Sequence, residues 1–138
     1  MSNRTFTIIK PDSVRKGNFG KIISRLETEG FRILSLKKVN LSTTQAEGFY
    51  GVHRERPFFP DLVRYMTSGT VYVAALEKEG AVPALRALMG ATDPAKADAG
   101  TIRKEFGESI EQNAIHGSDS DDNARIEIGF FFAESELM

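Results

Sequence analysis

The sequence contains no cysteine and no tryptophan, and its only histidines are His53 and His116. Without cysteine the protein has no disulfide framework, no thiolate zinc site and no cysteine nucleophile. Two histidines are also too few for a multi-histidine metal centre. Cysteine chemistry and a histidine-rich or thiolate metal site are therefore excluded.

Long apolar runs and an excess of charge are also lacking. The longest uninterrupted apolar run, Val71 to Leu76, is far shorter than the ~18 residues of a membrane span, and the first five residues contain no apolar signal region. With 18 Lys and Arg against 19 Asp and Glu, the net charge is −1, so the positive field typical of nucleic-acid binders is missing. We expect a cytoplasmic protein with no membrane partner and no specific nucleic-acid partner.

What the sequence does contain is typical of a globular protein. Of its 138 residues 41% are hydrophobic and 27% charged, and a chain of this length buries roughly two-thirds of its unfolded surface. We find no internal repeat, low-complexity tract or linker. The composition predicts a single domain over residues 1–138.

Hydrophobic periodicity predicts alternating strands and helices. The predicted elements, in chain order, are a strand over 5–9, an amphipathic helix from Phe19 to Gly30, a strand over 31–41, a short helix capped by Thr43 or Thr44, a helix over 59–66, a strand over 71–76, a helix over 82–89 that Gly90 ends, a loop from Ala91 to about Ile115, a short helix capped by Ser120, and a closing strand at Phe130–Phe132. The strand over 71–76 is apolar on both faces, which is typical of a central strand. This order predicts an α+β fold, a ferredoxin-like βαββαβ sandwich with a mostly antiparallel four-stranded sheet and helices packed on it.

The common phosphate-binding loops are absent. The segment from Gly17 to Lys21 has glycines too close together for a P-loop, and Ile22 stands where that motif needs Ser or Thr. The same segment matches the short GxxG motif of KH modules, but it precedes a single helix instead of joining two. A phosphate group, if bound, must be held by side chains.

The strongest local signal is the stretch from Asn113 to Ser120, which reads NAIHGSDS. Glycine after His116 allows close backbone approach, and imidazole suits nucleophilic and acid–base work at neutral pH. A solvated loop histidine would have the same pattern. A serine-hydrolase triad is disfavoured because GxSxG is absent.

Dispersed cations supply a second signal. Lys10 ends the first strand, Arg86 borders a helix stripe and Arg103 lies in the long loop. Each alone is more often a solvated surface charge, yet two guanidinium forks and an ammonium together suit a triphosphate. Phe58 falls outside the apolar stripe of its helix, where it is either an edge-of-core residue or a stacking surface for an aromatic ligand.

These motifs resemble those of the nucleoside diphosphate kinase family in order and spacing. The matching runs are IKPD at 9–12, RPFF at 56–59, MGATDP at 89–94, GTIR at 100–103 and NAIHGSDS at 113–120. The resemblance extends from Thr5 to Phe132. It implies a ferredoxin-like fold and a ping-pong transfer of the γ-phosphoryl group from a nucleoside triphosphate to a nucleoside diphosphate.

The resemblance also implies roles for individual residues. His116 would be the nucleophile that becomes phosphorylated. The positions that match phosphate and ribose ligands are Lys10, Arg86, Thr92, Arg103 and Asn113; Phe58 matches the residue that stacks on the base, and Tyr50, Ser118 and Glu127 match the residues that support the histidine. Mg²⁺ would arrive with the nucleotide, bridging its phosphates, without ligands from the protein. A homo-oligomer, either tetramer or hexamer, is implied.

Two alternatives belong to other functional classes. One is a non-catalytic ferredoxin-like module that binds RNA through the aromatic residues Phe130–Phe132, although the scattered basic residues argue against it. The other is a regulatory domain that binds nucleotide without turning it over. Removal of His116 would abolish a kinase and spare either binding module.

Overall fold

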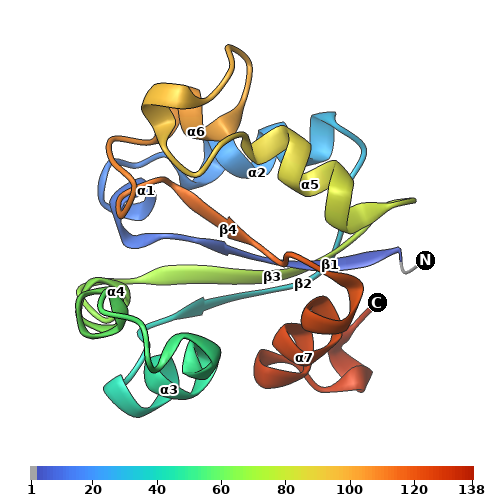
Figure 1. Cartoon of the computed structure of the whole chain (residues 1–138). Coiled ribbons are helices and arrows are strands. Elements are labelled where there is room, and N and C mark those ends of the chain that lie inside the picture. Colours follow the sequence, from blue (N-terminus) through green and yellow to red (C-terminus); the bar gives the residue numbers. More distant parts are fainter. Residues whose placement is uncertain (1–2) are drawn as a thin grey trace.

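A four-stranded antiparallel sheet lies at the centre of the computed structural model, which describes residues 3–138 (Figure 1). The strands are β1 (Arg4–Ile9), β2 (Arg32–Val39), β3 (Val71–Glu77) and β4 (Ile115–Gly117), and they lie in the order β2-β3-β1-β4. Each neighbouring pair is antiparallel. The predicted ferredoxin-like α+β fold is confirmed. Met1 and Ser2, part of the N-terminal segment considered above, lie outside the described residues.

Helices cover both faces of this sheet (Figure 1). They are α1 (Pro11–Arg15), α2 (Phe19–Thr28), α3 (Thr43–Phe49), α4 (Phe59–Met66), α5 (Ala81–Met89), α6 (Ile102–Phe106) and α7 (Asp121–Phe131), with 3₁₀ turns η1 (Gly51–His53), η2 (Pro94–Lys96) and η3 (Glu134–Glu136). The pair α2 and α5 lies on one face, and α3, α4 and α7 lie on the other. Within residues 3–138, no helix has the length and apolarity needed to cross a membrane.

The two faces of the sheet bury two separate hydrophobic cores. Alternate β3 residues supply both, because Val71, Val73 and Ala75 pack in the core with α3, α4 and α7, whereas Ala74 and Leu76 pack in the core with α2 and α5. This two-sided burial explains the continuous apolar run of β3, and the strand is central as predicted, with β1 and β2 as its neighbours.

The predicted strand at Phe130–Phe132 is wrong. Phe130 and Phe131 form the last turn of α7, and Phe132 caps it. Three consecutive aromatic residues favour a strand. The helix nevertheless begins at the predicted Ser120 cap and packs Ile128 into the hydrophobic core that it shares with α3 and α4. Phe131 stacks on Phe6 at 5.5 Å between ring centroids. The tertiary contacts of this helix outweigh the local strand preference. Phe132 is buried and Phe131 packs on Phe6, whereas Phe130 remains 42% exposed.

The segment from Ala91 to Ile115 is also more ordered than predicted. It contains η2 and α6, and its last residue begins the closing strand β4. Both α6 and β4 are too short to show a periodic pattern. The start of α3 differs as well, because Ser42 is the N-cap, and its side chain accepts a hydrogen bond from the Gln45 N–H.

Candidate active site

Two adjoining cavities open beside β4, with volumes of about 370 and 490 Å³. The residues that line both are Tyr50, Phe58, Leu62, Thr92, Arg103 and His116. His116 therefore lies where the two cavities meet. A third cavity of about 620 Å³, lined by Arg125 and Phe132 among others, includes none of the residues predicted for the site.

A carboxylate and a hydroxyl fix the orientation of the His116 ring. His116 lies in β4 opposite Ile8 of β1, and its Nε2 is 2.9 Å from Glu127 Oε1 on α7. Ser118 is fully buried, and its Oγ donates a hydrogen bond of 2.7 Å to the same Glu127 oxygen. With Nε2 engaged, Nδ1 is the ring nitrogen available for reaction.

Aromatic rings from β1 and from the end of α3 surround the imidazole. The ring centroids of Phe49, Phe6 and Tyr50 lie 5.7, 6.1 and 6.5 Å from that of His116, all edge-on. Burial, with the nearby charge of Glu127, raises the pKa of the Tyr50 phenol, which therefore stays protonated. Sequence reasoning missed Phe6 and Phe49; Phe49 precedes Tyr50, but nothing local indicates that either ring faces the histidine.

Lys10 is buried at the floor of the smaller cavity. Only 7% of the residue is exposed, and its Nζ donates to Asn113 Oδ1 at 2.8 Å and to the Glu111 carbonyl at 2.9 Å. Asn113 Nδ2 in turn donates to the Thr92 carbonyl at 3.0 Å. Burial lowers the pKa of Lys10 to about 8, although Asp12 acts in the opposite direction.

Two guanidinium groups line the larger cavity together with His116. Arg103 is 8% exposed; its Nη1 donates to the Gly90 carbonyl at 3.1 Å and its Nη2 to the Ile115 carbonyl at 2.9 Å. Its buried Nε has no hydrogen-bond partner among the described residues. Burial, and then repulsion from Arg86, lowers the pKa of Arg103 to about 10. Arg86, on α5, is exposed and lines the larger of the two cavities. Both positive groups line the cavity that an anionic ligand would enter.

Phe58 lies at the mouth of both cavities. It occupies the N-cap position of α4 and is 48% exposed, with its ring 5.5 Å from that of His53. The ring therefore presents a face to a ligand that enters the cavities. Ile110 and Ile126, which the sequence did not single out, are exposed apolar residues that line one cavity each.

The fold thus gathers residues that are distant in the sequence. Every residue predicted for the site lines one of the two cavities except Ser118, which lies behind Glu127. No group of three or more His, Cys, Asp or Glu side chains suited to a metal is present within residues 3–138. A histidine nitrogen beside one ammonium and two guanidinium groups defines a site for chemistry on a phosphorylated ligand, and with the α+β fold it indicates a phosphotransferase.

Comparisons with known proteins identify the family. The family model described as nucleoside diphosphate kinase matches residues 3–137. The nucleoside diphosphate kinase of Campylobacter jejuni is 60% identical over 134 residues, which is 97% of this chain and 98% of that protein. The chain belongs to the nucleoside diphosphate kinase family, and it is an enzyme that transfers the γ-phosphoryl group of a nucleoside triphosphate to a nucleoside diphosphate.

Solved structures agree with this assignment. The Aquifex aeolicus nucleoside diphosphate kinase superposes with a TM-score of 0.97 at 44% identity, with 100% of both chains covered. The enzyme of Halobacterium salinarum, solved in complex with CDP, superposes with a TM-score of 0.94 at 40% identity, over 100% of this chain and 92% of that one.

Proposed function

We propose that the phosphoryl group passes through His116. In the first half-reaction the Nδ1 lone pair attacks the γ-phosphorus, the bond to the β,γ-bridging oxygen breaks, and the nucleoside diphosphate leaves with that electron pair. In the second half-reaction a terminal oxygen of another nucleoside diphosphate attacks the phosphorus and the N–P bond breaks. The observation that carries this proposal is the position of His116 at the junction of both cavities, with Nε2 held by Glu127 at 2.9 Å.

Glu127 and Ser118 have a supporting role in this mechanism. Glu127 accepts the Nε2–H of the imidazole, so Nδ1 carries the lone pair, and the carboxylate stabilises the positive charge that the ring gains when the N–P bond forms. Ser118 fixes that carboxylate by donating to it. Tyr50 closes the site beside the ring, and its raised pKa keeps the phenol a neutral donor.

The remaining residues hold the nucleotide in the proposed function. Phosphoryl transfer needs positive charge beside the equatorial oxygens of the moving group, and the residues that supply charge or polar donors are Lys10, Arg86, Thr92, Arg103 and Asn113. Arg103 lines both cavities, so its guanidinium offers positive charge to the phosphates, although its Nε is itself buried. The exposed face of Phe58 stacks on the base, which tolerates different bases.

The family uses a divalent cation, which we propose to be Mg²⁺ bound to the phosphates of the nucleotide. The side chains that line the smaller cavity fit an ion held by the nucleotide, because most of the charged ones are cationic. The described residues contain no cluster of carboxylates that would hold the ion directly. The ion supplies charge neutralisation at the phosphate oxygens when bound. Lys10, Arg86 and Arg103 orient the same phosphates from the protein side.

A single domain, cytoplasmic location and assembly into a tetramer or hexamer complete the proposal, and family membership supports all three. The outer strand β2 pairs with β3 alone among the described strands, and its Leu34 carbonyl accepts from the Met138 N–H at 3.3 Å. It carries Leu36, which is 41% exposed, so we expect a second copy to pack at this edge of the sheet. Sedimentation equilibrium distinguishes four from six subunits.

Intact-mass analysis after mixing with Mg-ATP tests the central step. The wild type should gain the mass of one phosphoryl group, lose it on addition of a nucleoside diphosphate, and lose it also in acid, because phosphoramidates are acid-labile. His116→Ala should fold and gain nothing, since its ring is partly exposed and its removal opens no core cavity. Nucleotide binding with no phosphorylation of the wild type would instead favour a nucleotide sensor.

A further inference from the structure

Ala114 occupies a strained backbone turn between two residues of the site. It is the one non-glycine residue within 3–138 that has a positive φ, 77°. The Ile115 N–H donates to the Asn113 carbonyl at 2.9 Å across it, which makes a three-residue γ-turn of the rare, strained hand. Asn113 precedes this turn and His116 follows it by two residues. The turn therefore sets the directions of both side chains, and the surroundings must hold it in place.

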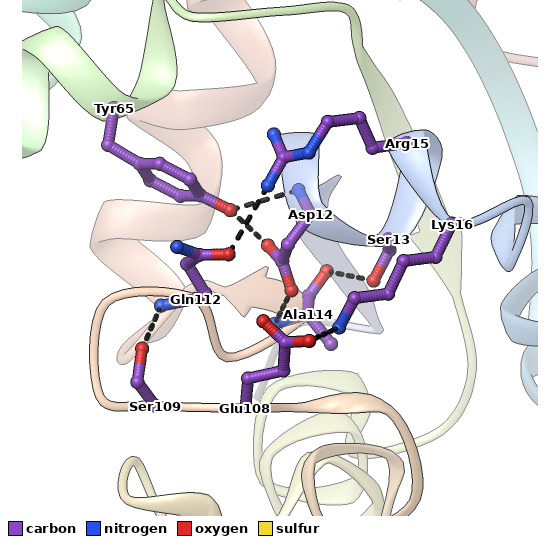
Figure 2. A network of polar contacts seen from close by, with 9 residues as sticks. All are labelled: Asp12, Ser13, Arg15, Lys16, Tyr65, Glu108, Ser109, Gln112 and Ala114. Carbon is purple, nitrogen blue, oxygen red and sulfur yellow. Dashed lines mark hydrogen bonds and ion pairs between the residues drawn. The ribbon is translucent and has the colours of Figure 1, made fainter.

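Helix α1 and the residue before it hold both polar groups of Ala114. Figure 2 shows the contacts that Asp12 and Ser13 of α1 make with it. The Ala114 N–H donates to Asp12 Oδ2 at 3.1 Å. Its carbonyl accepts from the Lys10 N–H at 3.0 Å and from Ser13 Oγ at 3.1 Å. All four residues are buried, so water does not compete for these groups.

A tyrosine from the opposite layer orients the Asp12 carboxylate. The Tyr65 hydroxyl, on α4, donates to Asp12 Oδ1 in a short contact and accepts the Asp12 N–H at 2.9 Å. Burial, reinforced by Asp12, raises the pKa of the Tyr65 phenol, so it remains a donor. One carboxylate oxygen is thus fixed by Tyr65 while the other holds Ala114, and Figure 2 shows the two contacts on opposite sides of the carboxylate.

A second set of contacts joins the same segments at the surface. Lys16 Nζ lies 2.5 Å from Glu108 Oε1, and Arg15 Nη2 donates to Gln112 Oε1 at 3.2 Å. Solvent screens such exposed pairs, which contribute little to stability or position. They provide a matched control, because they join the same two segments without contacting the turn.

We infer that Asp12, oriented by Tyr65, is a positioning residue: it holds the strained turn at Ala114 and so fixes how Asn113 and His116 face the cavity. Asp12 is fully buried and lines neither of the two cavities; it acts on the reaction through the turn. The inference rests on the proposed role of His116.

Glycine at position 114 distinguishes this role from others. Glycine adopts a positive φ without steric cost, so Ala114→Gly weakens the need for an external restraint. Asp12→Ala should slow phosphoenzyme formation at saturating Mg-ATP by roughly 10²-fold, the scale of a misplaced reacting group. The double variant Asp12→Ala/Ala114→Gly should recover about tenfold of that loss, because the turn again forms without restraint. Ala114→Gly alone should remain close to wild type.

The measurements are rapid-quench rates of phosphoenzyme formation, taken well below the unfolding midpoint of each variant, so that a loss of stability alone leaves the rate unchanged. Lys16→Met is the control and should be as fast as wild type. If Asp12→Ala does not fold, Tyr65→Phe with and without Ala114→Gly carries the same comparison, with a smaller loss and a recovery of the same sign.

Two results overturn the inference: a full rate in folded Asp12→Ala or Tyr65→Phe, or no recovery with glycine at position 114. The proposed function fails separately, because it requires that the wild type form a phosphoenzyme and that His116→Ala form none.

Discussion

At the scale of single residues, the buried cations link nucleotide binding to pH. Burial lowers the pKa of Lys10 to about 8, so the ammonium is charged below that pH and increasingly neutral above it. We expect the KM for nucleoside diphosphate to rise as the pH passes about 8, because a neutral amine does not attract phosphate. Steady-state kinetics across this range measure the effect, and Lys10→Met, with a higher KM throughout, should lack the inflection. A flat KM in the wild type contradicts it.

The lowered pKa of Lys10 also affects stability, which should rise with pH where the affinity for nucleotide falls. Between about 8 and the ordinary value of 10.5 the unfolded chain binds the Lys10 proton more tightly than the folded protein does. The contribution of this group to the free energy of unfolding therefore rises with pH over that interval. Lys10 is thus a residue that costs stability at neutral pH and serves the proposed binding of phosphate.

The two arginines should separate binding from structure. Arg86→Ala removes a charge-assisted donor on an exposed side chain. We expect kcat/KM to fall by an amount that corresponds to about 1.5–3 kcal/mol of transition-state stabilisation, with little change in the unfolding midpoint. Arg103→Ala should lower both kcat/KM and the unfolding midpoint, because it also leaves the part-buried Gly90 carbonyl and the buried Ile115 carbonyl without their donors. Lysine at either position should rescue only in part, since it lacks the guanidinium fork. Kinetics and thermal unfolding of the four variants test this, and equal midpoints for both alanine variants would contradict it.

Phe58 should govern affinity and leave the chemistry unchanged. Phe58→Ala should raise the KM for ADP, GDP, CDP and UDP alike and largely preserve kcat. The loss of binding free energy should be up to ~1–3 kcal/mol, the contribution of one stacked base. Near-absolute preference of the wild type for one base would argue against stacking, because recognition of a base edge rejects the wrong base strongly.

At the scale of elements, close packing of α5 on β4 places Arg86 and His116 in the lining of the same cavity. A Cβ added at Gly117 would lie 2.5 Å from Met89 Sδ and 3.0 Å from Leu85 Cδ2, both on α5. Gly117→Ala should therefore push α5 away from the sheet, destabilise the fold by roughly 1–3 kcal/mol and raise the KM for nucleotide.

Gly20→Ala is the matched control for that substitution. Its added Cβ meets no heavy atom within 4 Å, and alanine favours the helix in which it lies. Stability from chemical denaturation and KM should be unchanged or improved. A Gly117→Ala variant that behaves like Gly20→Ala would show that the α5–β4 contact does not position Arg86.

At the scale of the whole molecule, ligand binding should stabilise the fold, because residues of α3, α4, α5, α6, α7 and β4 line the cavities and unfolding separates them. Nucleoside diphosphate at 100 times its Kd should add about 2.7 kcal/mol to the free energy of unfolding. His116→Ala should retain this shift while its transfer activity is lost. Thermal unfolding with and without ligand measures it, and a shift that disappears with the imidazole would mean that His116 mainly binds nucleotide.

The sequence by itself determined the larger elements and the order of the motifs. The apolar run over 71–76 and the helical spacing from Phe19 to Leu26 act locally, so both appear in the structure as β3 and α2. The short strand β4 and helix α6 contain too few residues to show a periodic pattern. The aromatic residues at 130–132 favour a strand locally, but Phe130 and Phe131 end α7, and Phe131 packs on Phe6. Local preferences are weak, and burial over many contacts decides between them.

Only the tertiary structure decided how the site works. The sequence motifs indicated His116, Lys10 and Arg103, but their spacing along the chain says nothing of the 2.9 Å contact from Nε2 to Glu127, the burial that lowers the Lys10 pKa, or the rings of Phe6 and Phe49 beside the imidazole. The left-handed turn at Ala114 is the clearest case, because alanine gives no local signal for a positive φ. Lys10 and Ser13 donate buried hydrogen bonds to the Ala114 carbonyl, and Asp12 accepts one from the Ala114 N–H. These residues lie about a hundred positions earlier in the chain, and they impose the conformation of Ala114 once β1 and β4 pair.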